Sequence, residues 1–129
     1  MGMRVTALAL WTFFLFPIRC LSIPIAPLSR NAEVAWRRLL FRVWGVGACR
    51  IAGMRVTITG TPPKPPFYLV TNHLSLVDVV LLGRATGCVF VSRADVREVG
   101  VLGYMAKVMN TIFIDRSKKR DTQRVNDII

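Results

Sequence analysis

Apolar residues dominate the first part of the chain and form an uninterrupted run before any periodic pattern begins. This run covers 14 residues, Val5 to Ile18, between Arg4 and Arg19. At about 1.5 Å per residue a helix of this length covers roughly 21 Å, less than the roughly 30 Å of a hydrocarbon core. We therefore expect an interfacial or re-entrant membrane anchor, while a full span extended through Leu28 and a signal peptide stay open. Three prolines argue against one continuous helix to that point: Pro17, Pro24 and Pro27.

The next segment, Asn31 to Ala52, shows helical periodicity instead. Its apolar positions recur along one stripe, and three basic residues, Arg37, Arg38 and Arg42, fall away from that stripe. A basic face opposite a tryptophan-bearing apolar face suits a helix on an anionic bilayer, and packing against its own domain is the alternative. The stripe consists of Trp36, Leu40, Val43, Trp44, Gly47 and Ile51.

Short apolar segments alternate with helical segments in the rest of the chain. Strands are predicted at Arg55–Gly60, Phe67–Thr71, Cys88–Val91 and Thr111–Ile114, and helices at Ser75–Arg84, Val101–Val108 and from Ser117 onward. This alternation predicts an α/β fold, with a mainly parallel sheet flanked by helices. The proline-rich stretch Thr61–Pro66 is the clearest boundary, so we divide the chain into N-terminal membrane-docking helices with the first strand, residues 1–60, and an α/β domain, residues 61–129.

Composition narrows the possible partners. The chain has 129 residues, of which 53% are hydrophobic, and a net charge of +11. High apolar content together with positive charge indicates an anionic membrane surface, and the absence of nucleic-acid motifs argues against a nucleic-acid partner. Three scattered cysteines and one histidine give no metal-site spacing, so we expect no metal and read the cysteines as reduced, buried thiols. We expect the protein at the cytoplasmic face of the cell membrane.

Candidate chemistry is concentrated between Phe67 and Leu82, around the single histidine of the chain. His73 is predicted in a turn after a buried strand, and Ser75 is predicted to cap the following helix. Asp78 is then the third helical residue, from which its carboxylate can reach back to the imidazole of His73. Both residues also have purely structural interpretations, a polar turn and a helix cap, and the two roles of Asp78 are compatible.

The segment NHLSLVD resembles the N-H-x-x-x-x-D block of the glycerolipid acyltransferases, the family of 1-acylglycerol-3-phosphate acyltransferases. Phe113–Arg116 resembles the second block of that family, and Arg93–Tyr104 resembles the stretch that links the two. The three features occur in the family's order and spacing. The resemblance covers roughly Val56 to Arg124.

This resemblance implies a membrane-associated enzyme and a role for each of four residues. His73 would be the general base and Asp78 would orient it, while Arg116 would bind the acceptor phosphate and Arg93 would stand where relatives place a lysine, as a second substrate-binding residue. The reaction would move an acyl group from acyl-CoA or an acyl carrier protein to the sn-2 hydroxyl of lysophosphatidate, giving phosphatidate without metal or prosthetic group. Another lysolipid or ornithine-lipid acceptor, or a non-enzymatic basic membrane-anchored module, is the alternative.

Two features depart from the family pattern. Asn110 occupies the place where the second block often has glycine, and we expect it to adopt positive φ, because asparagine tolerates that conformation better than most residues. The third family block, E-G-T-R or similar, does not occur before Ile129. We therefore expect the chain to be the first part of a longer enzyme, catalytically incomplete as given and with a sheet that is incomplete at its C-terminus.

Overall fold

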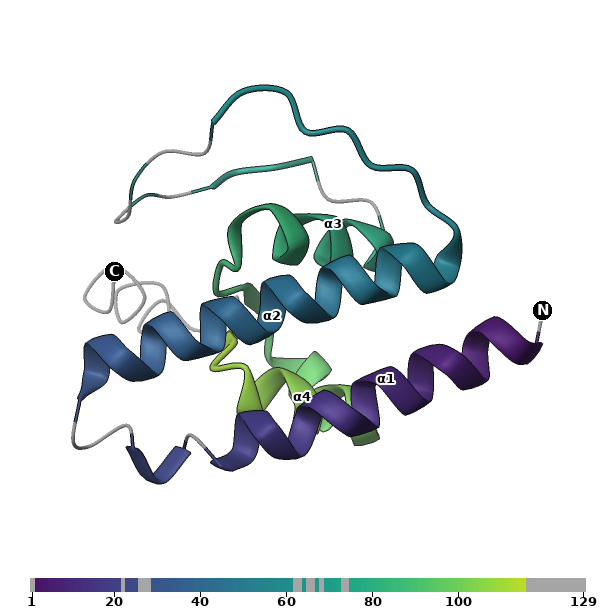
Figure 1. The fold of residues 1–129 in the computed structure, drawn as a ribbon. Helices are drawn as coiled ribbons and strands as arrows, with labels where there is room; N and C mark the ends of the chain where they lie inside the picture. Colours follow the sequence, from purple (N-terminus) through teal and green to yellow (C-terminus); the bar gives the residue numbers. More distant parts are fainter. Residues whose placement is uncertain are drawn as a thin grey trace. The chain divides into compact units, whose positions relative to one another are not determined.

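The computed structural model describes residues 2–21, 23–25, 29–61, 64, 67, 69–72 and 75–115. The chain forms two compact units, Met1–Cys88 and Val89–Ile129, and each is described by itself. The first unit is helical, and the second contains a small parallel sheet (Figure 1). The helix that follows the proline-rich connector belongs to the first unit. The predicted division into residues 1–60 and 61–129 stays a prediction.

The apolar run lies within a longer helix than its composition indicated. Helix α1, Gly2–Leu21, has 20 residues and continues through Pro17, and a short 3₁₀ helix, Ile23–Ile25, follows it. The arginines at both ends of the run lie within the helix, and both side chains bond to residues of α2. Arg4 donates a hydrogen bond to the Ala52 carbonyl at 3.0 Å, and Arg19 pairs with Glu33. Among the described helices, α1 alone is long and apolar enough to cross a membrane, by length and composition.

Helix α2, Arg30–Ala52, confirms the second predicted helix and has a defined cap at each end. The side chain of Ser29 accepts a hydrogen bond from the backbone N–H of Ala32 at 3.3 Å. At the other end Gly53 has φ 75°, and its N–H and that of Met54 donate to the last carbonyls of the helix, at 3.0 and 2.9 Å. This is the Schellman arrangement, in which glycine supplies the left-handed residue.

The face of α2 that is buried differs from the predicted stripe. Arg37, expected on an exposed basic face, is only 7% exposed, whereas Trp36, expected on the apolar stripe, is 40% exposed. The physical reason is that α2 packs against two helices, α1 and α3, on different sides (Figure 1). A pattern that assumes one buried stripe therefore misses the second contact. The alternative in which this helix packs within its own domain describes α2 correctly.

Glycines allow these helices to approach closely. Helix α3, Leu76–Thr86, crosses α2 where Gly45 lies against the backbone of Arg84 and Gly83 lies against the ring of Phe41. On the other side of α2, Gly47 lies against the indole of Trp11, whose N–H donates to the Trp44 carbonyl at 3.2 Å. Side chains at these glycine positions would force the helices apart, so the packing of α2 on both neighbours depends on them.

The second unit is a strand–helix–strand unit. Strand β1, Val91–Arg93, is followed by the 3₁₀ helix Ala94–Glu98, helix α4, Gly100–Val108, and strand β2, Ile112–Ile114. The two strands are parallel, in a register that places Val91 opposite Ile112, Ser92 opposite Phe113 and Arg93 opposite Ile114. A helical connection of this kind is what parallel strands require. The predicted helix Val101–Val108 and the strand at Thr111–Ile114 are thereby confirmed within a residue.

Asn110 adopts the conformation that its sequence position predicts. Its φ is 58°, and it is the one residue other than glycine with positive φ in the described part of the chain. It ends α4 in a Schellman arrangement, because its N–H donates to the Lys107 carbonyl and that of Thr111 donates to the Ala106 carbonyl, both at 2.9 Å. The turn into β2 is therefore kept without the usual glycine.

Three predicted strands need correction. Residues 55–60 form no strand, and neither do the described residues of Phe67–Thr71. The third strand begins at Val91 rather than Cys88. Strand formers such as Val56 and Ile58 establish a propensity, but a strand exists only where another strand pairs with it. The described fold is thus mostly helical with a two-stranded parallel sheet, which is consistent with the α/β class in its coarser sense.

The close contact between α2 and α3 predicts a stability effect. In Gly45→Ala the new methyl group would lie 2.8 Å from the backbone nitrogen of Arg84 and 2.9 Å from its Cα. Because backbone cannot rotate aside, we expect a loss of about 1–3 kcal/mol in the free energy of unfolding. Gly2→Ala is the matched control, since no atom lies within 4 Å of its added methyl group. Denaturant unfolding followed by circular dichroism tests this, and equal stability of the two variants would contradict it.

Candidate functional site

The N-terminal end of α3 is fixed by a reciprocal cap. Ser75 has extended backbone, φ −151° and ψ 165°, and its side chain accepts a hydrogen bond from the N–H of Val77 at 3.2 Å. In return, the Oδ2 atom of Asp78 accepts a hydrogen bond from the N–H of Ser75 at 2.9 Å. This confirms the predicted capping box. It also orients the Asp78 carboxylate back toward the residues that precede the helix.

His73 lies outside the described residues, two positions before Ser75 in the sequence. The predicted contact between its imidazole and Asp78 therefore stays a prediction. The described geometry fixes one partner of that contact: the Asp78 carboxylate is half-buried and turned toward the N-terminal side of α3. A carboxylate has about four acceptor positions, so a cap and a second hydrogen bond can coexist.

Arg93 ends strand β1 and forms an exposed ion pair. Its Nη2 atom lies 2.8 Å from Oδ2 of Asp95, and the two side chains are 68% and 62% exposed. The other oxygen of Asp95 accepts a hydrogen bond from the N–H of Val96 at 3.0 Å. Exposed pairs of this kind contribute only about 0–1 kcal/mol, so Arg93 can exchange Asp95 for another anion at little cost.

Strand β2 ends beside Arg93, because Ile114 is its partner in the register. Parallel strands present their carboxyl ends at the same edge of a sheet. Arg116 follows two residues after Ile114 and lies outside the described residues. Asp78 belongs to the first unit and Arg93 to the second, and each is described only within its own unit. The proposed substrate contacts of both arginines stay predictions.

Two charged contacts were not predicted. The first is Asp95 as the partner of Arg93, for which the signal is an acid two positions after the arginine. The second is a buried cluster in which Nη2 of Arg19 lies 2.7 Å from Oε1 of Glu33, and Nε of Arg37 lies 4.0 Å from the same oxygen. Burial lowers the pKa of Arg37, and Glu33 partly offsets that effect. The spacing of Glu33 and Arg37, one helical turn apart, is the signal for this cluster.

Comparison with known proteins decides the family. A family model described as Acyltransferase matches residues 54–129, more than half of the chain. The chain belongs to the acyltransferase family. The glycerolipid acyltransferase resemblance drawn from the sequence motifs is thereby confirmed.

Individual relatives of this acyltransferase carry two kinds of name. The chain is 32% identical over 122 residues to a lyso-ornithine lipid O-acyltransferase of Rhizobium meliloti (strain 1021). The matched region covers 93% of the chain and 42% of that protein. It is 30% identical over 120 residues to human 1-acyl-sn-glycerol-3-phosphate acyltransferase alpha, and the matched region covers 86% of the chain and 39% of that protein. It is 32% identical over 73 residues to the 1-acyl-sn-glycerol-3-phosphate acyltransferase of Saccharomyces cerevisiae (strain ATCC 204508 / S288c). The matched region covers 54% of the chain and 24% of that protein.

The acyltransferase chain spans less than half the length of these curated relatives. No solved structure matches it. The two kinds of relative share the acyltransferase name and differ in the named acceptor lipid, so the comparisons establish the family and leave the acceptor to be argued from the residues.

Proposed function

We propose that the protein transfers an acyl group from an acyl thioester to the sn-2 hydroxyl of 1-acylglycerol-3-phosphate, giving phosphatidate. The observation that carries the proposal is the capped start of α3, which holds the Asp78 carboxylate on the N–H of Ser75, two positions after His73 in the sequence. This stands in a chain whose residues 54–129 match the acyltransferase family. The donor is acyl-CoA or an acyl carrier protein.

The chemistry assigned to His73 is general base catalysis. Its imidazole accepts the proton of the acceptor hydroxyl while that oxygen attacks the thioester carbonyl. The carbon–sulfur bond then breaks, and the proton passes from the imidazolium to the departing thiolate. Asp78 orients the imidazole and stabilises its charged form, as an acid beside a catalytic histidine does elsewhere. The capping box supports this role because it restricts the carboxylate to one orientation.

Acceptor binding is assigned to Arg116, with Arg93 at the end of the neighbouring strand. A guanidinium group suits a phosphate dianion because it can donate two parallel hydrogen bonds. The register of β1 and β2 supports the pairing, since Arg93 lies opposite Ile114 at the edge from which the chain continues to Arg116.

A lyso-ornithine lipid is the second candidate acceptor. The observation that favours it is the 32% identity over 122 residues to a lyso-ornithine lipid O-acyltransferase. An ornithine headgroup carries no phosphate, so this acceptor would not need the contact assigned to Arg116. Competition between the two acceptors in one assay distinguishes the candidates.

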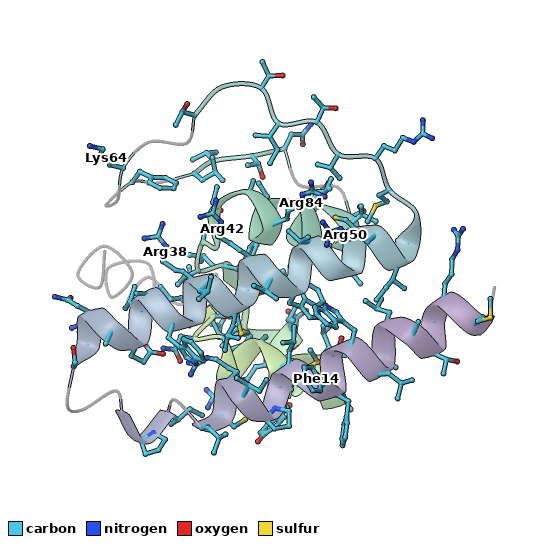
Figure 2. The ribbon with its side chains drawn as sticks, viewed as in Figure 1. Phe14, Arg38, Arg42, Arg50, Lys64 and Arg84 are labelled. Carbon is cyan, nitrogen blue, oxygen red and sulfur yellow. The ribbon has the colours of Figure 1, made fainter. Side chains whose placement is uncertain are left out.

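Membrane association is assigned to α1 lying in the plane of the interface. Its exposed apolar side chains include Met3, Leu10, Phe13 and Phe14, which are 64–87% exposed. Figure 2 labels Phe14 on α1. Helix α2 packs along α1, with contacts at Arg4–Ala52, Trp11–Trp44 and Arg19–Glu33. Because α2 also carries exposed arginines, the pair cannot cross a hydrocarbon core without burying their charges. The interfacial anchor is therefore favoured over a full span.

The cytoplasmic face of the membrane is proposed from the cysteines. Cys20, Cys49 and Cys88 are all free thiols, as expected in a reducing compartment. Their predicted burial holds only for Cys49, because the other two are partly exposed.

The catalytic role of His73 predicts a specific loss of activity. In the intact protein His73→Ala should lower turnover at least about 100-fold, because proton transfer by a positioned base contributes about that much. Binding to liposomes should be unchanged, since the assigned membrane helix is separate. Turnover and flotation measured on the same preparation test this. A folded variant with near-normal turnover would refute the catalytic role.

The acceptor role of Arg116 predicts a change in KM. Arg116→Ala should raise the KM for lysophosphatidate by roughly 10- to 150-fold, as expected for a lost charge-assisted contact of about 1.5–3 kcal/mol. The KM of the thioester donor should stay unchanged, and Arg116→Lys should recover only part of the loss. Arg97→Ala, at an exposed position, is the control. If the Ala variant still prefers the phosphate acceptor over a phosphate-free one as strongly as wild type, the phosphate is bound elsewhere.

The interfacial role of α1 predicts the effect of charge on its exposed face. Phe13→Asp combined with Phe14→Asp should abolish flotation with anionic liposomes, because carboxylates at these positions oppose insertion. The control combines Ile58→Asp with Val70→Asp, which changes two exposed apolar residues outside the helices, 50% and 95% exposed, by the same charge. Equal recovery of the two double variants with liposomes would count against α1 as the anchor.

A further inference from the structure

The chain places an acidic side chain directly beside Arg93, just after strand β1. The Oδ2 atom of Asp95 lies 2.8 Å from Nη2 of Arg93, and its Oδ1 atom accepts a hydrogen bond from the N–H of Val96 at 3.0 Å. Both charged side chains are more than half exposed, so a ligand can reach either of them. The place assigned to acceptor binding therefore holds a negative charge as well as a positive one.

The backbone that carries Asp95 is fixed by close packing on α4. A side chain at Gly103 would collide with the backbone carbonyls of Val96 and Arg97, so α4 lies directly against the 3₁₀ helix that follows β1. The N–H of Val99 donates to the Val96 carbonyl at 3.2 Å, and the N–H of Gly103 donates to the Val99 carbonyl at 2.8 Å. Asp95 therefore keeps its position, whereas the long side chain of an arginine can leave it by rotating its own bonds.

The two charges are at the carboxyl end of the parallel sheet. Arg93 is the last residue of β1 and lies opposite Ile114, the last residue of β2. Ligands of open α/β sheets bind just outside this end of the strands. A guanidinium binds phosphate best with two nitrogens at once, and Asp95 already occupies one nitrogen of Arg93. An acceptor headgroup at this edge therefore meets the carboxylate together with the guanidinium.

The charge of the headgroup decides how Asp95 acts on it. A phosphate dianion needs the guanidinium that Asp95 occupies, and the carboxylate repels it because both are negative. A headgroup that carries a carboxylate and an ammonium group can pair its carboxylate with Arg93 and its ammonium with Asp95. Specific sites use such repulsion against one ligand as well as attraction for another.

We propose that Asp95 is a specificity-determining residue, which opposes a phosphate headgroup and favours a headgroup that carries both a carboxylate and an ammonium. This rests on the proposed acyl transfer and on the binding role assigned there to Arg93. It distinguishes the two candidate acceptors, because an ornithine headgroup carries both charges and the phosphate of lysophosphatidate only negative charge. Asp95 weakens phosphate binding without preventing it, since Arg93 leaves an exposed pair at little cost.

Acceptor kinetics of the intact protein test the proposal with Asp95→Asn, which removes the charge and keeps an oxygen for the N–H of Val96. At low salt the KM for lysophosphatidate should fall about fivefold and that for a lyso-ornithine lipid should rise about fivefold, as one exposed pair allows. The kcat and the KM for palmitoyl-CoA should be unchanged. The control is Glu98→Gln, an equal change of charge at an exposed position on the same 3₁₀ helix.

The opposite directions of the two changes guard against a loss of folding, since a damaged protein would bind both acceptors more weakly. The proposal is overturned if either acceptor KM stays unchanged in Asp95→Asn, or if both change in the same direction. It is also overturned if Glu98→Gln reproduces the effect, because the net charge of the protein would then be its cause.

Direct binding separates this result from the proposed function. Titration calorimetry with hexanoyl lysophosphatidate should give a lower Kd for Asp95→Asn than for wild type, whether or not acyl transfer occurs. This difference in binding without any acyl transfer would refute the proposed function alone. Acyl transfer without the difference, or no binding by wild type, would refute the role of Asp95.

Discussion

The first unit depends on how closely α2 can approach two helices at once. Gly45 and Gly47 are two residues apart on α2, so they face different sides of it, and each lies against a large residue of a neighbour, Arg84 on α3 and Trp11 on α1. Because glycine has no side chain, both neighbours reach the backbone of α2. The buried pair of Arg19 and Glu33 then fixes the far end of α1 on α2. The capped start of α3, with Asp78, is positioned through this packing.

Local features of the fold were predictable because they depend on neighbouring residues alone. The capping box of Ser75 and Asp78 follows from two residues three apart, and the conformation of Asn110 follows from its place in a turn. The bounds of α2 follow from periodicity and from the glycine at its end. In each case the partners that satisfy the backbone lie within a few positions in the sequence, so no knowledge of tertiary contacts was needed.

Features that depend on distant partners were predicted less well. Helical periodicity placed Arg37 away from the apolar stripe, but it is buried one helical turn from Glu33, whose carboxylate offsets part of the cost of burying its charge. The strand predicted at Arg55–Gly60 has suitable residues and no described partner strand. Helix α1 was predicted too short, because the bonds that hold Arg4 and Arg19 join it to residues of α2. Within the candidate site, the position of Asp78 was predictable from the cap, whereas the pairing of Arg93 with Asp95 was not foreseen.

In the first unit, the exposed apolar residues of α1 and the arginines of α2 occur on different helices, a distinction that the overall composition does not show. A chain with 53% hydrophobic residues and a net charge of +11 indicates a membrane surface when taken as a whole. In the structure α1, which carries exposed apolar residues, and α3, to which Arg42 bonds, pack on different sides of α2. The proposed function uses an acceptor lipid from a bilayer and a thioester donor from the aqueous phase, and an apolar side and a charged side suit these two environments separately.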